Sequence, residues 1–179
     1  LPIEIINRSD VVDHFKVEAL GLPPGWVTQP SQPLYLLPNT RDSVSISLHP
    51  PMSSASAAGG HAFEVRVTAR AQGLKSSAQQ IALDVAPYYS YTIDLDPERI
   101  RRRGRAELVI KNTGNTTAKY TIQTKDREQM VRFEVNGSQY TLAPGQIEYV
   151  PIRIWPSRRH LFGQTVTYPF EISVVPTPT

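Results

Sequence analysis

Short runs in which apolar and polar residues alternate recur along the whole chain. In Ser43–Leu48, the side chains of Val44, Ile46 and Leu48 fall on one side of the run and three serines fall on the other. This period of two is that of a β-strand with one buried face. No segment carries apolar residues at the helical spacing, so we expect an all-β protein with no helix beyond a turn or two.

The alternating runs predict strands of similar length that are separated by turn residues. In the first half of the chain they cover residues 3–7, 13–20, 34–37, 42–49, 61–71 and 77–86. In the second half they cover residues 89–95, 105–112, 117–124, 129–135, 139–142, 147–155 and 166–175. Short strands at this spacing, each with one apolar face, favour antiparallel sandwiches of two sheets.

The sequence matches itself when it is shifted by 105 residues, with one residue inserted after the fourth matched pair below and one more before the last. The matched pairs are Asn7 with Asn112, Phe15 with Tyr120, Tyr35 with Tyr140 and Leu37 with Leu142, then Ile46 with Ile152, and last Phe63 with Phe170. Matches in one order with small gaps indicate a repeated unit. We therefore predict two tandem domains of the same kind, residues 1–86 and 87–179.

The two predicted domains differ at their ends. Residues 88–95 form a leading strand that has no counterpart before Ile3, and the strand after residue 77 has no counterpart after Thr179. We expect a piece of a longer chain, in which the first domain lacks its leading strand and the second lacks its trailing strand. Unpaired strand edges favour association, so an edge-strand dimer is one expected partner arrangement.

Several short motifs follow the order found in a known class of proteins. The first domain contains GLPPGW and a strand that ends in HPP, and the second contains KNTGN, LAPG and YPFEI. These motifs resemble the tandem immunoglobulin-like modules of uncharacterised bacterial proteins, which belong with sandwiches of the PapD and major-sperm-protein type. The resemblance implies a non-catalytic spacer or docking module of a larger, often surface- or membrane-associated protein, and it brings no functional residues with it.

Composition and charge exclude several classes of protein. No run of 18 apolar residues is present, so we expect no membrane span, and the absence of cysteine excludes disulfides and thiolate metal sites. The compartment stays open, although the resemblance implies the cell envelope or surface. Up to Pro87 there are 6 Lys and Arg against 7 Asp and Glu, whereas from Tyr88 there are 13 against 9, so the second half carries the positive charge behind the net +3 of the chain.

Arginines form the sharpest candidate site for binding an anion or an acidic partner. One run consists of Arg99, Arg101, Arg102, Arg103 and Arg105, and a second consists of Arg158 and Arg159. Guanidinium groups bind phosphate and carboxylate through paired hydrogen bonds. No aromatic residues are interleaved with them, which argues against single-stranded nucleic acid. The alternative is a solvated loop that is partly neutralised by Asp94, Asp96 and Glu98.

Other reactive side chains form no known catalytic or metal-binding motif. The four histidines, His14, His49, His61 and His160, have none of the spacings of zinc proteases or hydrolases. The acidic residues Asp94, Asp96 and Glu98 alternate, but Pro97 interrupts them. We therefore expect no enzymatic activity, no metal and no cofactor.

The glycine-containing stretch IKNTGNTTAKY, residues 110–120, predicts a turn between two strands, with Asn112 and Gly114 supplying its geometry. A phosphate-binding glycine loop opens onto a helix, whereas residues 117–124 alternate as a strand. The sequence as a whole favours a structural or protein-interaction module whose partners are other proteins or flanking domains of the same chain. The alternative function is binding of an anionic polymer, an anionic surface or an acidic partner through the loop from Arg99 to Arg105.

Overall fold

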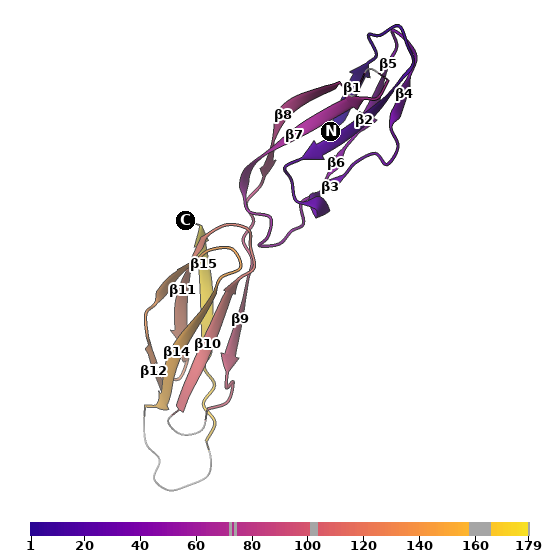
Figure 1. The fold of residues 1–179 in the computed structure, drawn as a ribbon. Coiled ribbons are helices and arrows are strands. Elements are labelled where there is room, and N and C mark those ends of the chain that lie inside the picture. The colour runs from indigo at the N-terminus through magenta and orange to yellow at the C-terminus, as the bar shows by residue number, and fades with distance from the viewer. Residues whose placement is uncertain (72, 74, 101–103, 158–165, 179) are drawn as a thin grey trace. The chain divides into compact units, whose positions relative to one another are not determined.

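The computed structural model describes residues 1–71, 73, 75–100, 104–157 and 166–178. The protein is all-β, as predicted, with several antiparallel sheets; the only helical segment among these residues is a 3-10 turn, η1 (Pro24–Trp26). The chain divides into two compact units, which Figure 1 colours from indigo to magenta and from rose to yellow. Unit 1 comprises residues 1–51 and 58–86, and unit 2 comprises residues 52–57 and 87–179.

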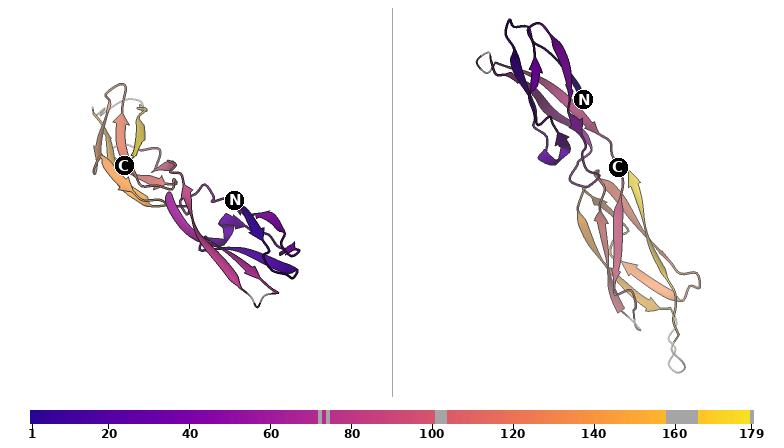
Figure 2. Two further views of the ribbon diagram at one scale, coloured as in Figure 1. Left: turned by 90° about the horizontal axis from the view of Figure 1, so that it is seen from above. Right: turned by 90° about the vertical axis from the view of Figure 1, so that its right-hand side faces the viewer.

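Unit 2 contains two sheets that lie face to face. Its strands are β9 (Tyr91–Asp96), β10 (Gly104–Asn112), β11 (Ala118–Lys125), β12 (Val131–Val135), β13 (Gln139–Leu142), β14 (Ile147–Pro156) and β15 (Glu171–Pro178). One sheet has the order β12-β14-β10-β9 and the other has the order β13-β11-β15. The two layers can be followed in Figures 1 and 2.

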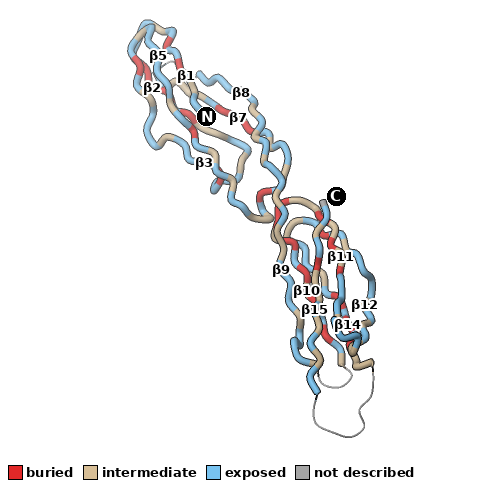
Figure 3. The backbone as a smooth tube through the Cα atoms, turned by 180° about the vertical axis from the view of Figure 1, so that it is seen from behind, coloured by how far each residue is buried: buried red, intermediate tan, exposed pale blue. Residues whose placement is uncertain are grey.

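The core of unit 2 lies between these two sheets. Leu108, Ile110 and Ile152 from the first sheet pack with Tyr120 and Val174 from the second. Buried residues concentrate on β10, β11 and β14, whereas the edge strand β9 has none (Figure 3). Burial of one face of each strand explains why the apolar residues alternate with polar ones.

Unit 1 contains one four-stranded sheet and two short pairs of strands. Its strands are β1 (Pro2–Ile6), β2 (Asp13–Leu20), β3 (Val27–Thr28), β4 (Leu34–Leu36), β5 (Arg41–Ser45), β6 (Ser47–Leu48), β7 (Gly59–Ala69) and β8 (Ser76–Val85). The large sheet has the order β4-β2-β7-β8, and the pairs are β1-β5 and β3-β6. The predicted single strand 42–49 is thus divided at Ile46, whose N–H donates to the Leu1 carbonyl at 3.0 Å.

The core of unit 1 is built from both kinds of sheet. Ile5 and Ile46 pack with Phe15 and Phe63 of the four-stranded sheet. Trp26 is only 4% exposed, and its ring lies 4.9 Å from that of His61 in an edge-on arrangement. Trp26, which follows the Pro-Pro-Gly bend, is therefore a core residue of unit 1.

Strand pairings in unit 1 recur in unit 2 with nearly constant offsets. Ile3 pairs with Val44 and Leu108 pairs with Val150, which gives offsets of 108 − 3 = 105 and 150 − 44 = 106. Val17 pairs with Val67 and Ile122 pairs with Val174, which gives offsets of 105 and 174 − 67 = 107. The order β4-β2-β7 of unit 1 therefore corresponds to β13-β11-β15 of unit 2.

The structure corrects two details of the sequence alignment. Asp13 pairs with Leu36 and Ala118 pairs with Leu142, so Leu36, rather than Leu37, corresponds to Leu142. The physical reason is burial: Leu36 and Leu142 are in the core, whereas Tyr35 and Leu37 are exposed. In addition, the last strand begins at Glu171 and not at residue 166.

A buried asparagine organises the same turn in each unit. In unit 1, Asn7 Nδ2 donates to the carbonyls of Val11 at 2.9 Å and Leu36 at 3.1 Å. In unit 2, Asn112 Nδ2 donates to the carbonyls of Thr116 at 2.9 Å and Leu142 at 3.0 Å. The side-chain oxygen of each accepts the N–H two residues later, which is an Asx-turn. The stretch 110–120 is therefore the end of one strand, a turn and the start of the next.

Glycine is needed at position 114 of this turn for a steric reason that does not apply to its counterpart, Ser9. A Cβ at Gly114 would lie 2.6 Å from the Tyr88 carbonyl oxygen and 2.9 Å from the Ser90 nitrogen. The segment before β9 packs there, with the Gly114 N–H donating to the Ser90 carbonyl at 2.9 Å. At the equivalent place Ser9 keeps its side chain, whose hydroxyl donates to Val11 O at 2.9 Å.

The two units are completed by edge strands in different sheets. In unit 1, β8 pairs with β7, the strand that corresponds to β15. In unit 2, β9 pairs instead with β10, the strand that corresponds to β1. Neither β8 nor β9 contains a buried residue. Among the described residues, β15 therefore has no strand at the edge where its counterpart β7 has β8. Likewise β1 has none at the edge where its counterpart β10 has β9.

Candidate functional site

The arginines singled out from the sequence are only partly described by the structure. Arg99 and Arg105 are exposed in unit 2. Arg101, Arg102, Arg103, Arg158 and Arg159 lie outside the described residues. The candidate site is therefore built from Arg105, which lies on β10, and from what surrounds it.

Arg105 lies directly across the sheet from Arg153 on β14. Arg153 also faces Glu134 on β12, with 3.4 Å between the guanidinium Nη1 and the carboxylate Oε2. Trp155 lies two residues after Arg153, and thus on the same sheet face, and its cross-strand neighbour is Arg132. We name these five residues, Arg105, Arg132, Glu134, Arg153 and Trp155, the arginine–tryptophan face.

The arginine–tryptophan face carries three positive charges and one negative charge on an exposed sheet surface. Four of its residues, together with Gly104, line a cleft of about 350 Å³. Like charges directly opposite each other destabilise a sheet, and Glu134 offsets part of this charge through its ion pair with Arg153. Two guanidiniums beside an indole can bind an anionic group through hydrogen bonds and stack a planar or sugar ring.

Sequence reasoning missed the tryptophan and the second arginine of this face. No aromatic residue is interleaved with the arginines in the sequence, but strand pairing brings Trp155 next to Arg105 from 50 residues away (155 − 105). Nothing local in the sequence signals this neighbourhood. It depends on the register of β10 with β14.

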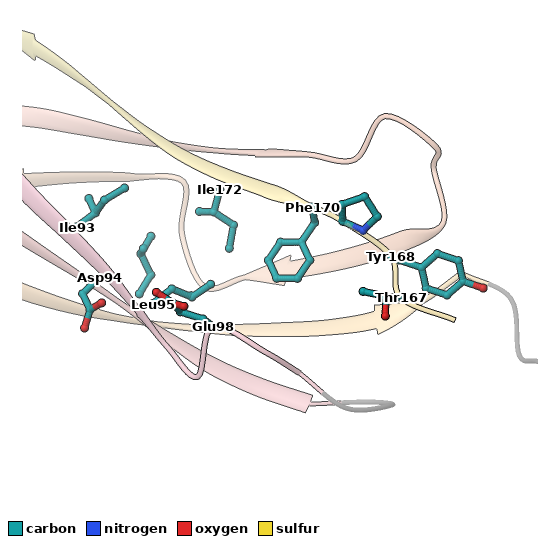
Figure 4. Close-up of a pocket in the computed structure, with 10 residues that line it drawn as sticks. Ile93, Asp94, Leu95, Glu98, Thr167, Tyr168, Phe170 and Ile172 are labelled. Atoms are coloured by element: carbon teal, nitrogen blue, oxygen red, sulfur yellow. The ribbon is translucent and has the colours of Figure 1, made fainter. Parts of the chain in front are cut away.

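A second cleft, of about 450 Å³, lies between the edge strands of the two sheets of unit 2. Its walls come from β9, from β10 and from the segment leading into β15; Figure 4 shows the side chains of Ile93, Phe170 and Ile172 between the ribbons. Asp94 and Glu98 supply acidic groups to it. In unit 1, β8 occupies the corresponding edge, and its Ile81 and Leu83 pack against the core.

The described histidines do not come together. His14 contacts the ring of Tyr35, His49 Nε2 lies 3.2 Å from Thr28 Oγ1, and His61 packs on Trp26. His160 lies outside the described residues. Within the described part of the chain, no group of three or more His, Asp or Glu side chains is placed to hold a metal ion.

Asp13 is a buried carboxylate that the sequence pattern did not reveal. Its Oδ1 accepts the backbone N–H groups of Ala71 at 2.7 Å, His14 at 2.7 Å and Arg70 at 3.0 Å. The hydrogen bond from Ala71 is the largest cause that lowers the pKa of Asp13 below its ordinary value of 3.8. Burial has a smaller effect in the opposite direction, and the bonds from His14 and Arg70 lower the pKa further. Asp13 therefore ties the turn after β7 to the start of β2.

Comparison with known proteins identifies little. No family model matches the chain, and no curated protein matches it. Among solved structures it is similar to the secreted serine protease VesC from Vibrio cholerae, at 8% identity and a TM-score of 0.34. The match covers 99% of this chain and 47% of that chain, so this chain spans about half the length of the protein it matches.

The sequence-based prediction that the chain is not an enzyme is corrected by this comparison. One of the solved structures to which the chain is similar is a serine protease, so the prediction made from the missing motifs does not stand. At this identity and TM-score the match assigns no catalytic role to any residue of this chain. Separately, no helix in the described residues is long and apolar enough to cross a membrane.

Proposed function

We propose that the chain forms two immunoglobulin-like sandwiches in series, of the PapD and major-sperm-protein type, that serve as a structural and protein-interaction module of a larger bacterial protein. The observation that supports this most is the recurrence of the same strand pairings in both units with offsets of 105 to 107 residues. A repeated sandwich supplies exposed sheet surface on which a partner can dock.

The test replaces unit 2 by a second copy of unit 1 in the parent protein. A spacer keeps the parent's activity after this exchange, because length and stiffness are preserved. A docking module loses it, because its surface residues change. Full activity after deletion of residues 1–179 overturns both forms of the proposal.

A second candidate function is favoured by the arginine–tryptophan face, namely binding of an anionic polymer, an anionic surface or an acidic partner. Its support is the direct pairing of Arg105 with Arg153 beside Trp155. Because binding of this kind releases counterions, it weakens steeply with salt.

Heparin chromatography tests the second candidate with two variants of equal charge. Arg105→Ser with Arg153→Ser removes two positive charges from the face. Lys119→Ser with Lys125→Ser removes two from β11, in the other sheet. The arginine variant is expected to elute at clearly lower salt than the lysine variant, and equal elution of the two contradicts a specific site.

A further inference from the structure

The strand β8 leaves a long unpaired edge on unit 1. Among the residues that the structure describes, it is the last strand in the order β4-β2-β7-β8, and its ten residues pair with β7 on one side only. The Ala69 N–H donates to the Lys75 carbonyl at 2.9 Å, so Lys75 faces β7. Residues alternate along a strand. The residues whose backbone N–H and C=O groups face away from β7 are therefore Ser76, Ala78, Gln80, Ala82 and Asp84.

This edge lacks the protection that strand edges usually carry. β8 contains no proline, no glycine and no lysine or arginine, and its single charged residue is Asp84 near one end. Native proteins block exposed edges with prolines, charges or covering segments, because bare edges pair with other chains.

The equivalent edge of unit 2 is protected, which makes the bare edge of β8 informative. Thr121 pairs with Val175, and the Ile122 N–H donates to Ser138 in the opposite direction, so Val174 and Pro176 face the outer edge of β15. Pro176 has no N–H to offer there. The Tyr91 hydroxyl donates to the Val174 carbonyl at 2.8 Å. Two features thus block strand addition at this edge.

We propose that β8 pairs antiparallel with β8 of a second copy of this chain. The two-fold axis passes between the two Gln80 residues. In that register Gln80 faces Gln80, Ala78 faces Ala82, and Ser76 faces Asp84. The two four-stranded sheets then join into one continuous sheet.

Backbone direction and charge select this register. An edge-facing residue pairs only with another edge-facing residue, so a shift by one residue is excluded. Gln80 is the middle of the five edge-facing residues, so this register alone uses all five, each facing pair exchanging two backbone hydrogen bonds. The carboxylate of Asp84 meets a serine hydroxyl instead of a second carboxylate, so like charges do not face each other.

The second copy is the occupant that the strand itself fits. When β8 is paired antiparallel with itself, each edge-facing residue meets a compatible residue of the second copy. Homodimers with a two-fold axis are also the commonest assemblies. The inference rests on the proposed interaction role and names one surface and one partner for it. A monomeric protein removes the inference and leaves the exchange test of the proposed function unaffected.

Two lysine substitutions on the same strand test the register by sedimentation velocity over a range of concentrations. Gln80→Lys places two ammonium groups opposite each other and is expected to raise the dimer dissociation constant about tenfold. Ser76→Lys places each ammonium group opposite Asp84 and is expected to leave that constant unchanged or lower it. An unchanged thermal unfolding midpoint checks that both variants fold.

A wild-type chain that stays monomeric at all concentrations overturns the proposal, as does equal weakening by both lysines. Amide hydrogen exchange supplies an independent readout at single residues. Protection of Ala78, Gln80 and Ala82 is expected to rise with concentration, whereas Gln79 and Ile81, which bond to β7, stay unchanged. Concentration-dependent protection on β1 or β15 in place of β8 contradicts the proposed interface.

Discussion

Units 1 and 2 share a set of strand pairings and differ in the strand that completes them. β8 extends the sheet of β7 in unit 1, whereas β9 extends the sheet of β10 in unit 2. The consequence appears in the cores. Phe63, beside β8, is 2% exposed, while its counterpart Phe170 is half-buried at the margin of a cleft. An edge strand therefore determines how well the neighbouring core positions are covered.

The same difference explains local choices of residue that otherwise look arbitrary. Gly114 makes room for the segment that leads into β9, whereas its counterpart Ser9 keeps a side chain whose hydroxyl makes a local hydrogen bond. Pro176 faces an open edge, and its counterpart Ala69 donates a hydrogen bond toward the β8 side. Residues at equivalent positions thus follow the presence or absence of one neighbouring strand.

The largest expected contrast comes from truncating the two equivalent phenylalanines. Phe63→Ala is expected to lower the free energy of unfolding of unit 1 by about 3–5 kcal/mol, because it opens a cavity in a closed core. Phe170→Ala is expected to lower that of unit 2 by about 1–2 kcal/mol, because the side chain is only partly buried. Amide hydrogen exchange of β7 and β14 at increasing urea concentrations measures the free energy of unfolding of both units in one experiment. Equal losses contradict the role assigned to β8.

A reciprocal exchange in the turns is expected to give the next largest effect. Gly114→Ser forces a Cβ against the backbone at Tyr88 and Ser90, and is expected to destabilise unit 2 by about 1–3 kcal/mol. Ser9→Gly removes only local hydrogen bonds of the hydroxyl, to Asn7 and Val11, so less than about 1 kcal/mol is expected for unit 1. Urea denaturation measures both. A cost at Ser9 as large as that at Gly114 contradicts the steric explanation.

The smallest expected contrast concerns acid stability. Ala118 of unit 2 occupies the position that corresponds to Asp13, since 118 − 13 = 105. The pKa of Asp13 is lowered in the folded state, so its contribution is fully present above pH 3.8 and is lost as the pH falls through the folded-state pKa. Asp13→Asn is expected to reduce the loss of stability of unit 1 as the pH falls, and to leave the pH dependence of the stability of unit 2 unchanged. Circular dichroism and hydrogen exchange between pH 2 and 6 check this; an unchanged slope for unit 1 contradicts it.

Alternation of side chains made the strands predictable from the sequence. Val44, Ile46 and Leu48 needed only a period of two, and the offset of Phe63 from Phe170 survives in the strand pairing. The boundary at Ile46 was not predictable, because it depends on which strand pairs with each half. The alignment of Tyr35 with Tyr140 was wrong, because it matched two residues of the same chemical type. In the structure the correspondence follows burial instead, which places Leu34 and Leu36 inward.

The candidate site was predictable only in part. A run of arginines is visible in the sequence, but the pairing of Arg105 with Arg153 depends on register. Asp13 also escaped notice, because an acidic residue that begins a strand normally faces water. The three N–H groups that satisfy it come from the strand's own start and from a turn 57 and 58 residues away. Long-range partners of this kind leave no local pattern.

The buried asparagines have a consequence for the kinetics of folding. Asn112 looks like a local turn former, yet one of its hydrogen bonds reaches the carbonyl of Leu142, 30 residues later. A loop of that length must close before the bond forms, and closure costs entropy that later contacts recover. The turn therefore completes late. Asn112→Ala is therefore expected to speed unfolding far more than it slows refolding, which stopped-flow measurements in urea would show.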